Sequence, residues 1–88
     1  MYQVEFRPRA AEDFERLDQV VAARVLRKLR WLPENFDSVK VEPLTGPLTG
    51  LFKLRVGDYR VIYEADRENK VLTVRLVGHR RGIYDQSA

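Results

Sequence analysis

Residues 51–63 read LFKLRVGDYRVIY and predict a tight β-hairpin. Two stretches that alternate apolar and polar residues flank the break Gly57-Asp58, which is a strong short-range hairpin signal. Pairing the strands across this break sets Arg55 opposite Arg60. Since successive side chains point to opposite faces of a strand, one face of the hairpin is apolar. The other face carries three cations, Lys53, Arg55 and Arg60. Like charges placed opposite each other weaken a hairpin by up to about 1 kcal/mol, so we interpret this cationic face as a site for a bound anion.

The composition limits the classes of protein to which the chain can belong. With 88 residues there is room for one hydrophobic core, and we expect a single domain over residues 1–88. The absence of cysteine and the single histidine argue against a disulfide framework and a His-built metal site, and no cofactor is expected. No apolar run is long enough to span a membrane and no secretory signal begins the chain, so we expect a cytoplasmic protein. The net charge of +3 favours a polyanionic partner such as nucleic acid.

The remaining elements follow from periodicity and from helix-capping residues. Strands are predicted at residues 2–6, 51–56, 59–65 and 70–77, and helices at residues 8–17 and 18–32. Asp18 is the expected N-cap of the second helix, and Pro33 is expected to end it. Residues 35–50 are interpreted as a long connection, and Gly78 is expected to break the last strand.

This element order, β-α-α-β-β-β, predicts an α+β fold. The two helices form a hairpin that buries its apolar stripe on one face of a three- or four-stranded, largely antiparallel sheet. The opposite face is then expected to be open to water or functional, and it is the face onto which the cations project. The outer side of the second helix carries further cations and is interpreted as either a solvated surface or a partner contact.

Residues after the last strand extend the candidate site. If strands 59–65 and 70–77 pair, His79, Arg80 and Tyr84 return close to Arg60. Arginine stays protonated and can hold phosphate oxygens, whereas Lys53, His79 and Tyr84 can exchange protons. RNA has an internal nucleophile in its 2′-hydroxyl, so such a cluster could cleave RNA to a cyclic phosphate and a 5′-hydroxyl. The alternative interpretation is that these residues are ordinary surface residues that keep the protein in solution.

Two segments, LTGLFKLRVGDYRVIYE and VRLVGHRRGIYD, resemble the RelE/ParE superfamily of bacterial and archaeal toxins, and the RelE branch most. The resemblance covers nearly the whole chain and implies a RelE-like fold. It also implies the toxin of a type II toxin–antitoxin system, an endoribonuclease that needs no metal and cleaves mRNA in the ribosomal A site. A cognate antitoxin is the implied protein partner, and neither membrane binding nor direct DNA binding by the toxin alone is expected.

The resemblance also assigns roles to individual residues. The implied catalytic residues are Lys53, Arg60, His79, Arg80 and Tyr84, and the implied substrate-binding residues are Arg55 and Arg81. The implied antitoxin contacts are Arg24, Arg27, Lys28 and Trp31. An arginine at position 55 cannot readily act as a base, which leaves Lys53 and His79 as the two candidates for that role.

Two other functions fit the same sequence. A ParE-like toxin would share the fold but inhibit DNA gyrase and have no nuclease activity. A non-catalytic interaction module of the same fold would still bind a partner without affecting growth.

Overall fold

The predicted hairpin lies within the sheet of the computed structural model, which describes residues 1–84. Strands β3 (Phe52–Val56) and β4 (Tyr59–Asp66) pair antiparallel with Arg55 opposite Arg60, as the sequence predicts. Gly57 has a φ of +59°, and Asp58 is not among the non-glycine residues of positive φ in this described part of the chain. That combination matches a type II′ turn, in which glycine takes the first central position because side chains disfavour positive φ.

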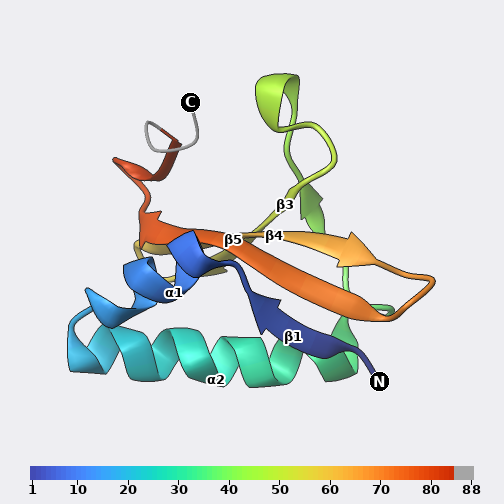
Figure 1. Ribbon diagram of the computed structural model, residues 1–88, viewed down its shortest axis with the longest axis horizontal. Coiled ribbons are helices and arrows are strands. Elements are labelled where there is room, and N and C mark those ends of the chain that lie inside the picture. The colour runs from blue at the N-terminus through green and yellow to red at the C-terminus, as the bar shows by residue number, and fades with distance from the viewer. Residues whose placement is uncertain (85–88) are drawn as a thin grey trace.

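The sheet has five strands in the order β1-β5-β4-β3-β2 (Figure 1). Strand β1 (Gln3–Phe6) runs parallel to β5 (Val71–His79), and the other neighbours are antiparallel. The α+β fold is therefore confirmed, with one strand more than predicted. The additional strand, β2 (Glu42–Pro43), lies in the segment that we interpreted as a connection. A strand of two residues is too short to show an alternating pattern, so the sequence did not predict it. Proline is tolerated there because β2 is an edge strand.

Two helices cover one face of the sheet, as Figure 1 shows. Helix α1 (Pro8–Glu15) begins with proline, and α2 (Gln19–Asn35) begins after Asp18, whose side chain accepts a hydrogen bond from the Val20 amide at 3.0 Å. The predicted N-cap is thus confirmed. The predicted stripe of α2 is buried at Val25, Leu29 and Leu32.

Two predicted breaks do not occur. Pro33 lies inside α2 rather than ending it, because Phe36 is only 2% exposed and packs edge-on against Tyr2 and Tyr63. Burial of this ring holds the chain in the helical direction past the proline, so tertiary packing overrides a local helix breaker. Gly78 does not break the last strand either, since it pairs with Arg60 and β5 continues to His79.

Hydrophobic clusters lie on both faces of the sheet. Two of them fill the space between the helices and the sheet, around Val25 and Val61 and around Phe36 and Tyr63. A third lies on the opposite face, where Ile83 covers Ile62 and Leu76 together with two partly buried leucines, Leu44 and Leu51. The expectation that this face is open to water or functional therefore needs correction, because part of it is a small core.

The third cluster positions the segments that flank the candidate site. In Figure 1 residues 80–84 and the loop that contains the 3-10 helix η1 (Gly46–Leu48) both rise on the side of the sheet away from the helices. Within residues 1–84 no helix is long and apolar enough to span a membrane. The tail segment VRLVGHRRGIYD ends at Asp85, which is outside the described residues, as is the rest of the predicted domain up to residue 88.

Candidate active site

The three cations of the hairpin lie on the side of the sheet away from the helices. Leu54 and Val56 pack into the core beneath the helices, so alternation directs Lys53 and Arg55 to the other side. Arg60 joins them because it is the direct partner of Arg55 across the hairpin. The cationic face predicted from the sequence therefore forms.

A carboxylate that was not among the predicted site residues lies beside these cations. Glu42 of β2 is the cross-strand partner of Lys53. Its Oε2 atom is 3.7 Å from Lys53 Nζ and 3.3 Å from Arg55 Nε. The chain itself thus supplies an anion that offsets part of the repulsion between the cations. The sequence signal for Glu42 is its position before Pro43, because a residue that precedes proline favours the extended backbone of a strand.

Arg60 and Arg80 are both attached to the hairpin turn. Arg60 Nη1 donates hydrogen bonds to the carbonyl oxygens of Gly57 and Tyr59, at 2.9 and 2.8 Å. The Arg80 amide donates to the Asp58 carbonyl at 2.8 Å, and its Nε lies 3.7 Å from Asp58 Oδ1. The end of β5 therefore returns to the turn beside Arg60, as the sequence predicts.

His79 is placed differently from the expectation. It pairs with Tyr59, and the two rings meet edge-on with centroids 5.4 Å apart, on the face that packs towards the helices. Strict alternation from Val74 would put His79 on the cationic face, but a β-bulge leaves Arg75 as an extra residue and reverses the parity of every later residue in the strand. The prediction that His79 joins the cationic face is therefore wrong. Its Nδ1 accepts a hydrogen bond from the Arg81 amide at 3.2 Å.

The tail after β5 is anchored by one apolar residue. Ile83 is fully buried in the cluster over Ile62 and Leu76, and the Gly82 amide donates to the His79 carbonyl at 3.0 Å. This anchor holds Tyr84, which is 40% exposed, on the same side of the sheet as the cations. The side chain of Arg81 is exposed.

A basic groove joins α2 to the hairpin. All four residues predicted to contact an antitoxin, Arg24, Arg27, Lys28 and Trp31, line a depression of about 280 Å³. Arg55, Val56 and Gly57 form its other wall, and the Lys28 ammonium lies 4.6 Å from the centroid of the Trp31 ring. A second depression, of about 230 Å³, shares Lys28, Trp31 and Arg55 and leads to Glu42 and Lys53. We refer to the two together as the basic groove.

The side chains present define the chemistry available. Burial raises the pKa of Tyr63, which lines the basic groove, to about 12, so its phenol stays protonated near neutral pH and is a poor base there. Glu42 and Lys53 are the groups on the cationic face that can exchange a proton, while Arg55, Arg60 and Arg80 can only donate hydrogen bonds. Within the described residues no group of three or more histidine or carboxylate side chains is arranged to hold a metal ion.

The fold and the cationic face together place the chain in a known class. Two helices on one face of a five-stranded mixed sheet constitute the RelE/ParE fold of type II toxins. The family described as ParE toxin of the type II toxin–antitoxin system, parDE, matches residues 4–84. The chain therefore belongs to this family and is a type II toxin of the RelE/ParE fold. Comparison with curated protein sequences gives no match.

Solved structures agree with that assignment. A chain of the toxin–antitoxin complex RelBE2 from Mycobacterium tuberculosis is 31% identical, with 90% of this chain and 98% of that chain covered and a TM-score of 0.81. A chain of the archaeal RelE–RelB complex from Pyrococcus horikoshii is 28% identical, with 90% and 94% covered and a TM-score of 0.70. The isolated RelE toxin of E. coli, 23% identical with a TM-score of 0.75 over 90% of this chain and 84% of that chain, shares the fold.

Proposed function

We propose that this toxin is an endoribonuclease that cleaves mRNA in the ribosomal A site. The observation that carries the proposal is the cationic face, on which Glu42 and Lys53 are in contact beside Arg55 and Arg60. RNA cleavage through the 2′-hydroxyl needs a proton acceptor and fixed positive charge at the phosphate. Both are present on one face of the sheet, where Glu42 of β2 lies beside the hairpin cations. The likeness of the hairpin and tail segments to the RelE branch supports the same substrate.

The reaction would proceed by in-line displacement at phosphorus. Glu42 accepts the proton of the 2′-hydroxyl, and the 2′-oxygen attacks the adjacent phosphorus as the bond to the 5′-oxygen breaks. Arg60 and Arg80 stabilise the negative charge that develops on the phosphate oxygens. An acid protonates the leaving 5′-oxygen, which yields a cyclic phosphate and a free 5′-hydroxyl. Lys53 and Tyr84 are the candidates for this acid, because the strand register directs His79 to the other face.

The arrangement assigns a distinct task to Lys53 and Arg55. Both contact the Glu42 carboxylate, so they hold it in place at the edge of the face. Neither contact is buried, since Glu42 is 44% exposed, and a phosphate that enters can therefore compete for the same cations. Glu42 is thus a third candidate for the base, in addition to Lys53 and His79, between which the resemblance did not choose.

A second candidate function is inhibition of DNA gyrase. One observation favours it, which is that the matching family carries the ParE description. Under this alternative the purified toxin inhibits supercoiling by gyrase and leaves mRNA intact, whereas under our proposal it does the reverse.

The partner proposed for this toxin is a cognate antitoxin that occupies the basic groove. The relatives from M. tuberculosis and P. horikoshii are chains of toxin–antitoxin complexes. The groove combines cations with the exposed Trp31, which fits an acidic segment with apolar anchors.

The test of the nuclease proposal is to add the purified toxin to translating ribosomes and map the new mRNA ends. Wild-type toxin should produce cuts at codon-defined positions, and Arg60→Ala should reduce their rate by about 10²–10³-fold, the usual cost of losing one transition-state charge contact. Arg30→Ala, an exposed arginine on α2 outside the basic groove, serves as the control and should cut normally. Intact mRNA with a folded wild-type toxin would rule out the proposal.

A further inference from the structure

A pocket lined by three arginines lies on the same side of the sheet as the cationic face. Its volume is about 380 Å³, and its charged residues are Arg7, Arg9 and Arg75. We refer to it as the arginine pocket. Among the described residues no acidic side chain lines it, and none of its lining residues belongs to the site predicted from the sequence.

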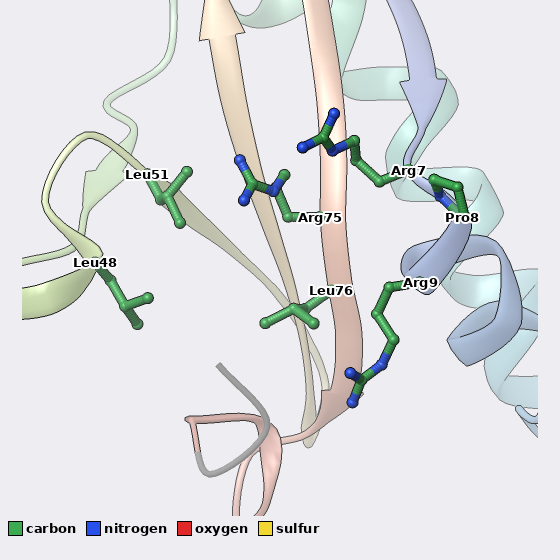
Figure 2. A pocket seen from close by; sticks show the side chains of 7 residues that line it. All are labelled: Arg7, Pro8, Arg9, Leu48, Leu51, Arg75 and Leu76. Atoms are coloured by element: carbon green, nitrogen blue, oxygen red, sulfur yellow. The ribbon is translucent and has the colours of Figure 1, made fainter. Parts of the chain in front are cut away.

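The pocket has a basic wall and an apolar wall. Figure 2 shows Leu48 and Leu51 of the loop on one side, Arg7 and Arg9 at the start of α1 on the other, and Arg75 with Leu76 on β5 between them. Such a surface suits a ligand that is anionic along one edge and less polar along the other. A nucleotide, with its phosphate and its sugar and base, has this character.

A β-bulge in β5 places Arg75 and Leu76 on the same side of the sheet, where both line the pocket. Ile62 pairs with Leu76 and Tyr63 pairs with Val74, so Arg75 is the unpaired extra residue of the ladder. Strict alternation from Val74 would direct Arg75 to the open side and Leu76 towards the helices, so the bulge is what keeps Leu76 beside Arg75. β-Bulges commonly re-aim a side chain next to a functional site. Here the bulge places an arginine and a leucine in succession on the open side.

The three guanidinium groups are held in different ways. Arg9 Nε contacts Asp13 Oδ1 at 3.2 Å. Since Asp13 is only 6% exposed, a buried carboxylate holds the Arg9 guanidinium in place. Arg75 Nη1 contacts Glu64 at 3.4 Å, a pair that is partly exposed and easily displaced. Among the described residues no carboxylate pairs with Arg7. The pocket therefore retains capacity for an anion.

The strand register gives the position of the pocket relative to the cationic face. Lys53 pairs with Ile62, and Ile62 pairs with Leu76, so one row of residues crosses β3, β4 and β5. Adjacent strands lie about 4.8 Å apart, which puts the two sites roughly 10 Å from each other. A single strand of RNA spans that distance within a few nucleotides.

From these observations we propose that the arginine pocket binds the phosphate backbone of single-stranded RNA beside the scissile nucleotides. The inference rests on the proposed nuclease function, since it takes RNA as the substrate. The pocket adds affinity and sets the path of the strand across the sheet, while Glu42 and Arg60 act at the bond that breaks.

Binding of an RNA that cannot be cleaved tests this proposal separately from catalysis. The probe is a short fluorescein-labelled single-stranded RNA in which every 2′-hydroxyl is methylated, and its anisotropy is measured against purified toxin at several salt concentrations. Each phosphate contact on a single strand contributes about 0.7 to the slope of log K against log salt. Arg7→Ala with Arg75→Ala should lower that slope by about 1.4 and weaken binding by about tenfold.

Two further variants complete the design. Arg30→Ala removes one exposed positive charge away from the pocket and should bind within about twofold of wild type. Arg7→Ala alone keeps the test available if the double variant does not fold, and should lower the slope by about 0.7.

Several results would overturn the inference. The first is the absence of RNA binding by wild-type toxin, and the second is an unchanged salt slope in the pocket variants. The third is that the pocket variants lose binding to purified antitoxin but still bind RNA normally. The last result would assign the pocket to a protein partner instead. Binding that depends on Arg7 and Arg75 in a toxin that never cuts mRNA would instead refute the nuclease proposal and leave the pocket standing.

Discussion

Glu42 lies at the edge of the sheet, in contact with both Lys53 and Arg55. Replacing this carboxylate on a face built from cations should affect the rate of the proposed reaction much more than the stability of the fold. Its ion pairs are exposed, and exposed pairs contribute only about 0–1 kcal/mol to stability. A general base, in contrast, typically contributes about 10²–10⁴-fold to the rate.

Glu42→Gln should therefore abolish most cleavage while leaving the fold nearly unchanged. We expect the single-turnover rate of mRNA cleavage to fall by at least about 10²-fold, because the amide cannot accept the 2′-hydroxyl proton. The free energy of unfolding, measured in urea, should change by less than about 1 kcal/mol. Glu68→Gln, an exposed acid in the turn between β4 and β5, is the matched control. Normal cleavage by Glu42→Gln would return the role of base to Lys53.

At the scale of elements, one buried carboxylate joins α1 to the sheet. β1 ends at Phe6, which pairs with Val74, so among residues 1–84 no strand lies beside this edge of β5 beyond that point. Asp13 of α1 takes that place, and its Oδ2 accepts a hydrogen bond from the Val77 amide at 3.1 Å. A helix side chain thus satisfies a strand edge that would otherwise be left unpaired.

Asp13→Ala should destabilise the protein through this bond. The Val77 amide would lose its acceptor in a buried setting, which costs about 1–3 kcal/mol. Urea unfolding measures the loss. Glu12→Ala, the exposed neighbour on the same helix, should cost less than about 0.5 kcal/mol. Equal effects of the two substitutions would contradict the role assigned to Asp13. Since Asp13 also anchors Arg9, the variant should bind the methylated RNA less tightly.

At the scale of the whole molecule, the basic groove and the candidate active site meet at Arg55. This residue lines the groove and contacts Glu42 on the cationic face. A partner that fills the groove would therefore reach the candidate active site from its edge.

Reversing charge in the groove should weaken the binding of the antitoxin. Arg27→Glu combined with Lys28→Glu places two negative charges against an acidic segment, and we expect the dissociation constant to rise by at least about tenfold, mainly through faster dissociation and lost steering. Calorimetry or surface binding with the co-expressed antitoxin measures it. The same charge change outside the groove, Arg16→Glu with Arg30→Glu, is the control. Equal affinity of both double variants would place the antitoxin elsewhere.

Sequence alone predicts the hairpin, its register, the three cations on one face and the two helices. Each of these depends on local periodicity or on a turn residue, such as the glycine at position 57, whose effect acts within a few positions. The N-cap at Asp18 belongs to the same group.

The other features depend on tertiary contacts. Glu42 reaches Lys53 because a two-residue strand pairs across the sheet, and Phe36 carries α2 past Pro33 because its ring is buried. One bulge keeps Leu76 outward beside Arg75 and directs His79 inward, because a single inserted residue reverses every face after it. These outcomes depend on contacts between residues far apart in the chain, and such contacts leave no periodic signal in the segments that make them.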